Sequence, residues 1–254
     1  MTCSALPYPA FDMHCHLGFS ANPAAAAQGI CEAGAGAFAV CVEPGEYLRA
    51  KDELAAWPCV RVGVGLHPWW VAQGRVGEAD VASACELVSR ERFVGEVGLD
   101  FGARFRESEL AQRDAFARIM RACASAGQRV VSLHAVHAAD AVLDVLEDTG
   151  AAHDCTCIFH WYSDTPEALQ RAIRLGCLFS LGRASLNTRR GREYARQIPA
   201  QCLLVETDLP VQGEPYDVDA AQRELAEVVA AIEELKGCAL REQMSETSRQ
   251  VLGL

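Results

Sequence analysis

Long apolar runs and cationic side chains are both scarce in this sequence. No stretch of about 18 uncharged apolar residues occurs, which argues against a transmembrane helix. Residues 1–11 lack the basic start and the apolar run of a secretory signal, so we expect a cytoplasmic protein without membrane association. Lys and Arg number 23 against 34 Asp and Glu, which gives a formal net charge of −11. This balance argues against passive binding to long nucleic acid, although metal ions and a local arginine cluster can still meet phosphates.

Cysteine pairs with metal-binding spacing and glycine-rich phosphate loops are also missing. The 12 cysteines are spread thinly from Cys3 to Cys238, and we interpret them as small core residues kept reduced in a cytosol. Cys155 and Cys157 are one residue apart, a narrower spacing than metal-binding pairs show, so we interpret them as structural. Neither a GxGxxG nor a Walker pattern is present, which disfavours a doubly wound sheet with a nucleotide loop.

Short apolar runs alternate with longer helical patterns along the whole chain. Most of the runs lack period-two alternation, which is typical of strands buried on both faces of a parallel sheet. Helical spacing is clearest over residues 107–126, 140–149 and 242–254. Eight β-then-α units predict an α/β fold, a (β/α)₈ TIM-type barrel that forms a single domain over residues 1–254, with a doubly wound sheet as the alternative. The predicted strands are Ala10–Met13, Ala37–Val42, Val60–Leu66, Phe93–Leu99, Arg129–Leu133, Thr156–Phe159, Cys177–Leu181 and Gln201–Val205.

Residue types that bind metals stand at or near the ends of most of these strands. The carboxyl ends of barrel strands form the mouth at which barrel enzymes carry out their chemistry. Histidine and carboxylate ligands collected there describe a di-metal hydrolytic site. The predicted ligands are His14, His16, Glu96, His134, His160 and Asp208.

Each of these residues has a structural alternative when it is taken alone. His14 and His16 share one face of a strand, but they could simply be polar residues near a strand end. Glu96 lies in an apolar strand, where an unpaired carboxylate is costly, yet it could cap a neighbouring element. Asp208 could be a helix cap. The two remaining histidines could be hydrogen-bonded core residues, but their collection at one barrel mouth favours the metal site.

The chemistry expected of such a site is hydrolysis. Two ions about 4 Å apart activate a water and stabilise the charge that develops on a phosphoryl or acyl oxygen. Glu96 can bridge two ions. Asp208 is suited both to bind one ion and to accept a proton from the attacking water, so we predict Glu96 and Asp208 as the catalytic carboxylates.

The order of these motifs resembles that of a known family. Asp-x-His-x-His, Gly-x-His-Pro, Gly-Glu-x-Gly-Leu-Asp and Glu-Thr-Asp follow one another between Phe11 and Leu254. This set resembles the TatD family of metal-dependent deoxyribonucleases, within the amidohydrolase-like barrels. The resemblance implies two divalent ions (Mg²⁺, Mn²⁺ or Zn²⁺) and removal of nucleotides from single-stranded or frayed DNA ends. It also implies one ion held by His14, His16, Glu96 and Asp208, a second held by Glu96, His134 and His160, and His67 close to the scissile phosphate.

The sequence departs from the family pattern at several positions. Val136 stands where the family usually has an arginine, and Trp161–Asp164 replaces the usual residues after the sixth strand. Leu209-Pro210 follows the aspartate in place of Ala-Pro, and Ser248 replaces an asparagine of the last helix. These departures concern substrate contacts and remove no metal ligand.

Two features outside the ligand set suggest substrate contacts. An arginine cluster follows the seventh strand, a region where barrels often bind phosphate, and we predict that Arg183 and Arg189 bind DNA. A solvated helix face is the alternative. Trp69 could stack on a terminal base, or pack at the rim. The members of the cluster are Arg183, Arg189, Arg190, Arg192 and Arg196.

Three functions are therefore compared. The sequence favours a phosphodiesterase acting on DNA ends. The first alternative is a hydrolase of a small amide, ester or lactone that uses the same metals; Val136 and the negative charge favour it, and the arginine cluster opposes it. The second alternative is an inactive barrel that acts as a binding protein, against which the intact ligand set argues.

Overall fold

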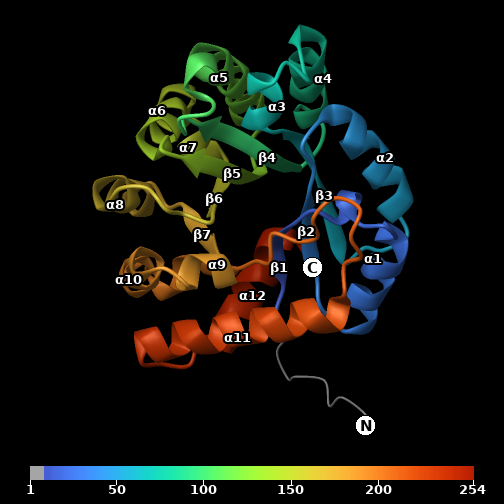
Figure 1. Ribbon diagram of the computed structural model, residues 1–254, viewed down its shortest axis with the longest axis vertical. Coiled ribbons are helices and arrows are strands. Elements are labelled where there is room, and N and C mark those ends of the chain that lie inside the picture. Colours follow the sequence, from blue (N-terminus) through green and yellow to red (C-terminus); the bar gives the residue numbers. More distant parts are fainter. Residues whose placement is uncertain (1–8) are drawn as a thin grey trace.

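Eight parallel strands form the centre of the molecule (Figure 1). The computed structural model describes residues 9–254. Each strand pairs in parallel with the next one along the chain, from β1 to β8. The first and last strands meet where the amide of Asp208 donates to the carbonyl of His14 at 2.9 Å, so the barrel is nearly closed. The strands are β1 (Asp12–Cys15), β2 (Ala37–Val40), β3 (Val60–Leu66), β4 (Phe93–Asp100), β5 (Val130–Val136), β6 (Thr156–His160), β7 (Leu178–Leu181) and β8 (Leu203–Val205). The predicted (β/α)₈ fold is confirmed.

Helices surround the strands on the outside (Figure 1). Several begin at the residues that local chemistry favours: Asn22 caps α1 and Thr165 caps α8, each just before a proline in the first turn. None of the helices that the structure describes combines the length and apolarity needed to cross a membrane. The α-helices are α1 (Pro23–Glu32), α2 (Pro44–Leu54), α3 (Pro68–Ala72), α4 (Glu78–Val88), α5 (Glu109–Ala126), α6 (Ala139–Thr149), α7 (Ala151–Asp154), α8 (Pro166–Arg174), α9 (Arg183–Leu186), α10 (Arg189–Gln197), α11 (Val218–Lys236) and α12 (Arg241–Leu252). The 3₁₀ turns are η1 (Leu17–Phe19), η2 (Arg106–Ser108) and η3 (Ala200–Cys202).

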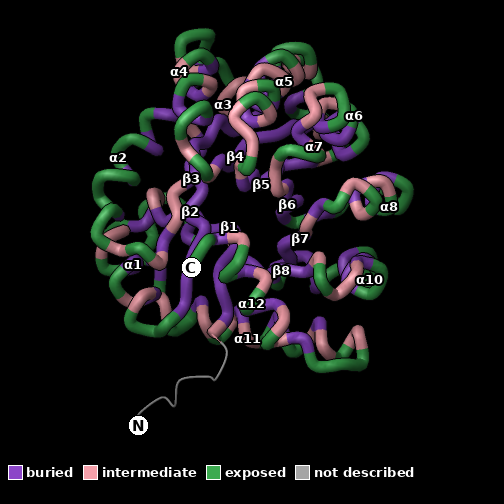
Figure 2. The backbone as a smooth tube through the Cα atoms, turned by 180° about the vertical axis from the view of Figure 1, so that it is seen from behind, coloured by how far each residue is buried: buried purple, intermediate pink, exposed green. Residues whose placement is uncertain are grey.

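The core lies on both faces of the strands. Figure 2 shows the strands buried in the centre while the helices expose their outer faces. A large apolar cluster joins the strands to the helices, and a second, smaller one gathers side chains of five strands with Leu252 of α12. Burial on both faces explains why the strands read as continuous apolar runs without alternation.

One expectation about the cysteines is wrong. Cys31 of α1 and Cys59, just before β3, form a disulfide with their Cα atoms 5.6 Å apart. The two residues lie 28 positions apart in the sequence, and only the packing of the fold brings them together, so their spacing gave no signal. The other nine cysteines among residues 9–254 are free thiols, Cys155 and Cys157 included.

Candidate metal centre

The predicted ligands gather at the carboxyl ends of the strands. All of them except His14 line a cavity of about 430 Å³. His14 is fully buried beside it, with Nε2 3.6 Å from carboxylate oxygens of Glu96 and Asp208. The two predicted substrate contacts His67 and Trp69 also line this cavity, which we call the main pocket. Its lining residues are His16, His67, Trp69, Glu96, His134, Ala135, Val136, His160, Trp161, Ser163 and Asp208.

Glu96 of β4 stands at the centre of the site, with its side chain almost fully buried. Its Oε1 lies 2.7 Å from Nδ1 of His134 and 3.0 Å from Nε2 of His160. Its Oε2 lies 3.6 Å from Nε2 of both His14 and His16. The two oxygens of one carboxylate therefore face two different pairs of histidines.

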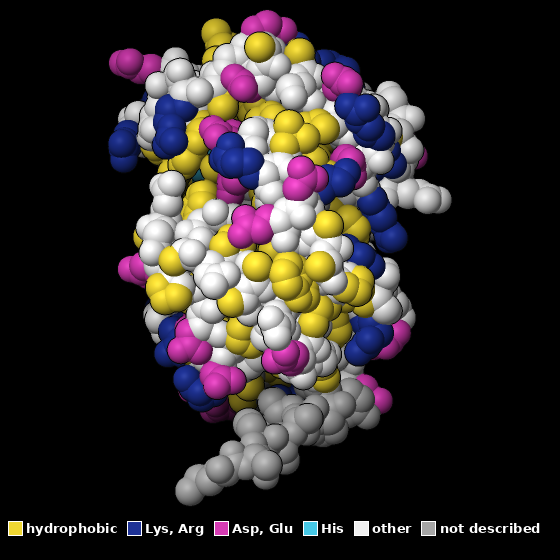
Figure 3. Space-filling view, turned by 90° about the vertical axis from the view of Figure 1, so that its right-hand side faces the viewer, with side chains coloured by type: hydrophobic (Ala, Val, Ile, Leu, Met, Phe, Trp, Pro, Cys, Tyr) yellow, Lys and Arg dark blue, Asp and Glu magenta, His cyan; other side chains and the backbone are white. Residues whose placement is uncertain are grey.

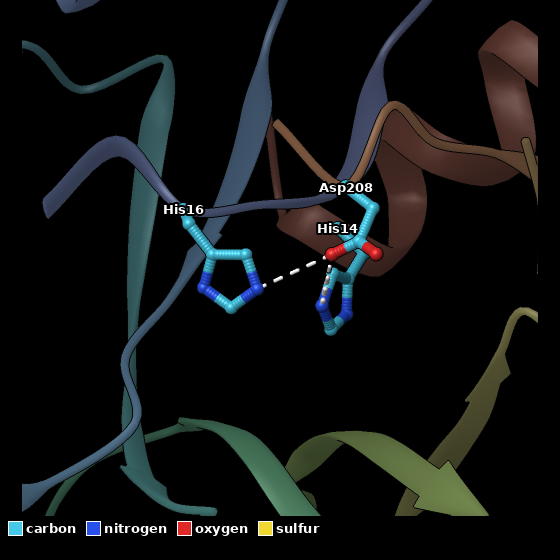
Figure 4. Close-up of side chains that lie close together, drawn as sticks. All are labelled: His14, His16 and Asp208. Carbon is cyan, nitrogen blue, oxygen red and sulfur yellow. Dashed lines mark ion pairs between the residues drawn. The ribbon is translucent and has the colours of Figure 1, made fainter. Parts of the chain in front are cut away.

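Asp208 completes the group on the side of β1. Its Oδ1 lies 3.2 Å from Nε2 of His16 and 3.6 Å from Nε2 of His14 (Figure 4). Donor atoms of His14, His16 and Asp208 all lie within 4.8 Å of one another, as three ligands of one ion must. His14 and His16 stand at the end of β1, and Asp208 follows β8, so the near-closure of the barrel brings the three residues together.

The protonation states of His14 and of the two carboxylates suit metal binding. Burial, followed by the nearby His160, lowers the pKa of His14 to about 4, so this imidazole is neutral at pH 7. Burial alone would raise the pKa of Asp208, but its hydrogen bond with His16 and the nearby histidines lower it to about 2. Burial would likewise raise the pKa of Glu96, and the surrounding histidines hold it well below its usual range. Neutral imidazoles and ionised carboxylates are the forms that bind metal ions.

Hydrogen bonding at the histidines also fits a metal site. Nδ1 of His14 lies 2.7 Å from the hydroxyl of Ser132, which orients the ring and leaves Nε2 toward the carboxylates. Nε2 of His14 is buried and has no hydrogen-bond partner among the described residues. A buried nitrogen without a partner is costly unless a ligand satisfies it. Imidazole and carboxylate donors together suit Zn²⁺ and Mn²⁺, so the residues present fit the implied ions.

His67 is arranged differently from the other histidines. Its Nδ1 accepts a 3.1 Å hydrogen bond from the amide of Trp69, so in the neutral ring the proton sits on Nε2. Burial lowers the pKa of His67, which favours this neutral form. Nε2 lies 3.1 Å from Oε1 of Glu96 and donates to it. His67 is therefore set up as a hydrogen-bond donor inside the main pocket.

Two carboxylates that the sequence analysis left without a role support these residues. Oδ2 of Asp100 accepts a 2.6 Å hydrogen bond from the indole of Trp69 and lies 3.3 Å from Nε2 of His134. Oε1 of Glu206 accepts from the amide of Trp161 at 3.1 Å and lies 3.6 Å from Nδ1 of His160. Asp100 ends the Gly-Leu-Asp motif and Glu206 begins the Glu-Thr-Asp motif, so the sequence motifs already contained both residues.

The arginine cluster is only partly at the site. Neither Arg183 nor Arg189 lines the main pocket, and Arg183 pairs with Glu227 at 2.8 Å and with Glu224 at 3.3 Å on α11. Arg190, by contrast, donates to the carbonyl of Ser163 at 3.3 Å, and Ser163 lines the pocket. Arg190 is the member of the cluster with a contact at the pocket rim.

The chain resembles characterised proteins along most of its length. A family model described as TatD related DNase matches residues 11–252. The chain is 25% identical to "Deoxyribonuclease TATDN3" of Homo sapiens over 211 residues, which cover 78% of this chain and 73% of that protein. It is 30% identical to the "3'-5' ssDNA/RNA exonuclease TatD" of Escherichia fergusonii over 177 residues, covering 65% and 64%. The solved structure of YJJV, a TatD homologue from Escherichia coli, superimposes with a TM-score of 0.79 at 21% identity and covers 96% of this chain and 98% of that one.

The barrel and its cluster of histidines and carboxylates define a hydrolase of the metal-dependent kind. The chain belongs to the TatD related DNase family.

Proposed function

We propose that this hydrolase holds two divalent ions and removes nucleotides from the ends of single-stranded or frayed DNA. His14, His16 and Asp208 would hold one ion and His134 with His160 the other. Glu96 would bridge them. The observation that carries the proposal is the pair of Glu96 oxygens, each directed at a different pair of these histidines.

The roles of the side chains follow from their positions. Divalent ions bound there supply Lewis acidity toward a phosphoryl oxygen and acidify a water molecule. The ionised carboxylate of Asp208, whose pKa is held at about 2, accepts the proton of the attacking water. His67 carries a proton on Nε2, which would turn from Glu96 to an oxygen of the scissile phosphate once Glu96 holds the ions. These roles rest on residues that surround a single cavity.

Two tryptophans support a nucleotide substrate. Trp69 and Trp161 line the main pocket and remain 39% and 41% exposed, which is unusual for so large an apolar side chain and leaves part of each ring open to a base, although Trp69 also stacks on Phe105. Arg190 beside Ser163 would meet a phosphate at the rim. Figure 3 shows acidic and basic side chains interspersed on the face that carries α1 and α2, without a continuous basic patch. That face therefore offers no extended site for a phosphate backbone.

One observation favours a second candidate function, hydrolysis of a small amide, ester or lactone. None of the residues from 9–254 that line the main pocket is a lysine or arginine, and Val136 is among them. A pocket without lysine or arginine suits an uncharged substrate beside the ions as well as it suits a nucleotide.

The proposal is tested with labelled single-stranded DNA, offered with Mn²⁺ or Mg²⁺ beside a set of amides and lactones. Release of mononucleotides that depends on the added ion supports the nuclease. Hydrolysis of amides or lactones without nucleotide release would favour the second candidate function instead.

We also propose a cytoplasmic location, supported by the nine free thiols of the described residues. Because the Cys31–Cys59 disulfide does not fit a reducing compartment, fractionation of the native cell is the test.

A further inference from the structure

A second, smaller hollow adjoins the main pocket, and we call it the seam pocket. Its volume is about 170 Å³, well under half that of the main pocket at about 430 Å³. Trp161 and Asp208 line both hollows, so the two meet at the proposed reaction centre. The residues that line the seam pocket are Trp161, Gly182, Ala184, Ser185, Glu206, Thr207, Asp208 and Leu209.

Ser185 supplies the seam pocket with an unused hydroxyl. This residue of α9 is only 2% exposed, and its Oγ has no hydrogen-bond partner within the part of the chain that the structure describes. Folded proteins pair nearly all buried polar atoms, so an exception calls for an explanation. A ligand group that reaches into the seam pocket and bonds to this hydroxyl provides one.

The turn that carries Ser185 is held in place by its neighbours. The carbonyl of Ser185 accepts from the amide and the hydroxyl of Thr188, at 3.2 and 3.0 Å. Gly191 of α10 packs against the same carbonyl so closely that a Cβ there would lie 2.0 Å from its oxygen. The backbone that carries Ser185 is therefore a fixed part of the fold, so a ligand needs only a rotation of this side chain, and no rearrangement of the turn, to meet the hydroxyl.

The chemistry of the lining selects the ligand. The described residues of the seam pocket include no lysine or arginine, and the carboxylates of Glu206 and Asp208 would repel a free anion. Ser185 offers a hydrogen bond, while Ala184 and Leu209 offer apolar contact. A small, neutral ring with polar substituents fits this lining and volume, and the pentose of a nucleotide is such a ring.

We propose that the seam pocket binds the pentose of the nucleotide on the far side of the scissile phosphate. The main pocket then holds the terminal nucleotide, the phosphate lies at Asp208, and the strand continues past Trp161 into contact with Ser185. The inference rests on the proposed nuclease function. It adds that the enzyme recognises a dinucleotide unit, and it assigns Ser185 and Ala184 to the second nucleotide.

The test compares binding of two inert ligands. One is a dithymidine analogue in which a methylene group replaces the scissile oxygen, and the other is the matching thymidine mononucleotide phosphonate; both are titrated with Mn²⁺ present. We expect the wild type to bind the dinucleotide about tenfold more tightly than the mononucleotide, as one or two added hydrogen bonds and apolar contacts allow. In Ser185→Ala, and in Ala184→Phe, which fills the hollow from an exposed position, this ratio falls to about threefold or less.

Controls separate binding from folding. Ser245→Ala also removes a buried hydroxyl, one that donates to the carbonyl of Pro9 at 3.1 Å and lines neither pocket, and it should keep the wild-type ratio. The midpoint of thermal unfolding of Ser185→Ala should not fall, because the lost hydroxyl has no partner to leave behind. A purely structural role would lower that midpoint and leave the binding ratio intact.

The result that overturns the seam pocket is an unchanged ratio in both Ser185→Ala and Ala184→Phe, or a wild type that binds the two ligands equally. Hydrolysis of labelled DNA is followed in parallel. A wild type that prefers the dinucleotide analogue but releases no nucleotides supports the subsite and contradicts the proposed function. A wild type that releases nucleotides but binds both ligands equally supports the proposed function and contradicts the subsite.

Discussion

The hydroxyl of Tyr216 donates a 2.8 Å hydrogen bond to Oδ2 of Asp12, although the two residues lie 204 positions apart. Asp12 belongs to β1 and also accepts from the amide of Thr207 at 3.0 Å and from its hydroxyl at 2.5 Å. Thr207 immediately precedes Asp208. This buried network therefore fixes the chain beyond β8 against β1, and with it the position of Asp208 opposite His14 and His16.

Tyr216→Phe should weaken metal binding as well as the fold. Loss of one buried hydrogen bond lowers the free energy of unfolding by about 1 kcal/mol. Because the same bond positions Asp208, the dissociation constant for Mn²⁺ should rise about tenfold, within the range for partners that orient ligands. Tyr194→Phe is the control: its hydroxyl donates to the carbonyl of Asp164 at 2.5 Å, so it should lose stability and keep its Mn²⁺ affinity. Equal Mn²⁺ affinity in both variants would show that the network serves stability alone.

Gly98 should not tolerate a side chain. It stands between Glu96 and Asp100 on β4 with φ +148°, and a Cβ there would lie 2.0 Å from the carbonyl oxygen of His134. Gly98→Ala should therefore cost about 3 kcal/mol of unfolding free energy or more, because the strand must shift. Gly74→Ala is the matched control: φ is +65° with nothing within 4 Å, so only backbone strain of about 1 kcal/mol applies. Urea unfolding that gives the same loss for both would disprove the close approach.

A carboxylate of α11 that accepts hydrogen bonds from the start of α12 should make stability depend on pH. Oε1 of Glu233 accepts from the amides of Leu240 at 2.7 Å and Arg241 at 2.9 Å. The hydrogen bond from Leu240 lowers the pKa of Glu233 below its ordinary value of 4.5. A lowered folded-state pKa gives a contribution that is present above the unfolded pKa and lost as pH falls through the folded one. Glu233→Ala should lose about 1 kcal/mol at neutral pH, as removal of a cap does.

Glu233→Gln separates the charge from the hydrogen bond, because the amide keeps an acceptor oxygen but does not titrate. Urea unfolding of the wild type and this variant between neutral pH and about pH 3 should show their difference in stability narrowing as the pH falls below 4.5. A difference that stays constant over this range would refute the role of the charge.

Arg190 should contribute more to DNA binding than Arg183. Arg190 contacts the rim through Ser163, whereas Arg183 is already paired with Glu224 and Glu227. Arg190→Ala should raise the Michaelis constant for DNA and lower the slope of log affinity against log salt by about one unit, as loss of one phosphate contact does. The Michaelis constant for a small activated phosphodiester should rise less. A larger effect of Arg183→Ala would support the prediction from the sequence that Arg183 binds DNA.

The sequence predicted the barrel and the collection of the ligands because both depend on local patterns. His14 and His16 share a strand face by their spacing, and Glu96 is conspicuous as a charge in an apolar strand. The alternation of strands and helices then places strand ends at one mouth. Those patterns need no knowledge of distant contacts.

Contacts between distant segments could not be predicted in this way. The Cys31–Cys59 disulfide and the Tyr216–Asp12 hydrogen bond join residues that only the packed fold brings together. The arginines show a further limit. The sequence shows that they cluster. It does not show that two carboxylates of α11 pair with Arg183, or that Arg190 points toward Ser163, because both depend on how the side chains pack.

If Glu96 lies between two bound ions, the number of ions held by each chain should show it. Protein loaded with Mn²⁺ and freed of excess ion is analysed for bound manganese in the wild type, in His134→Ala and in His153→Ala. His153 is an exposed histidine of α7 and serves as the control. The account predicts about two ions per chain in the wild type and His153→Ala, and about one in His134→Ala, since the group around His14 is left intact. One ion or fewer in the wild type, or two retained in His134→Ala, would contradict it.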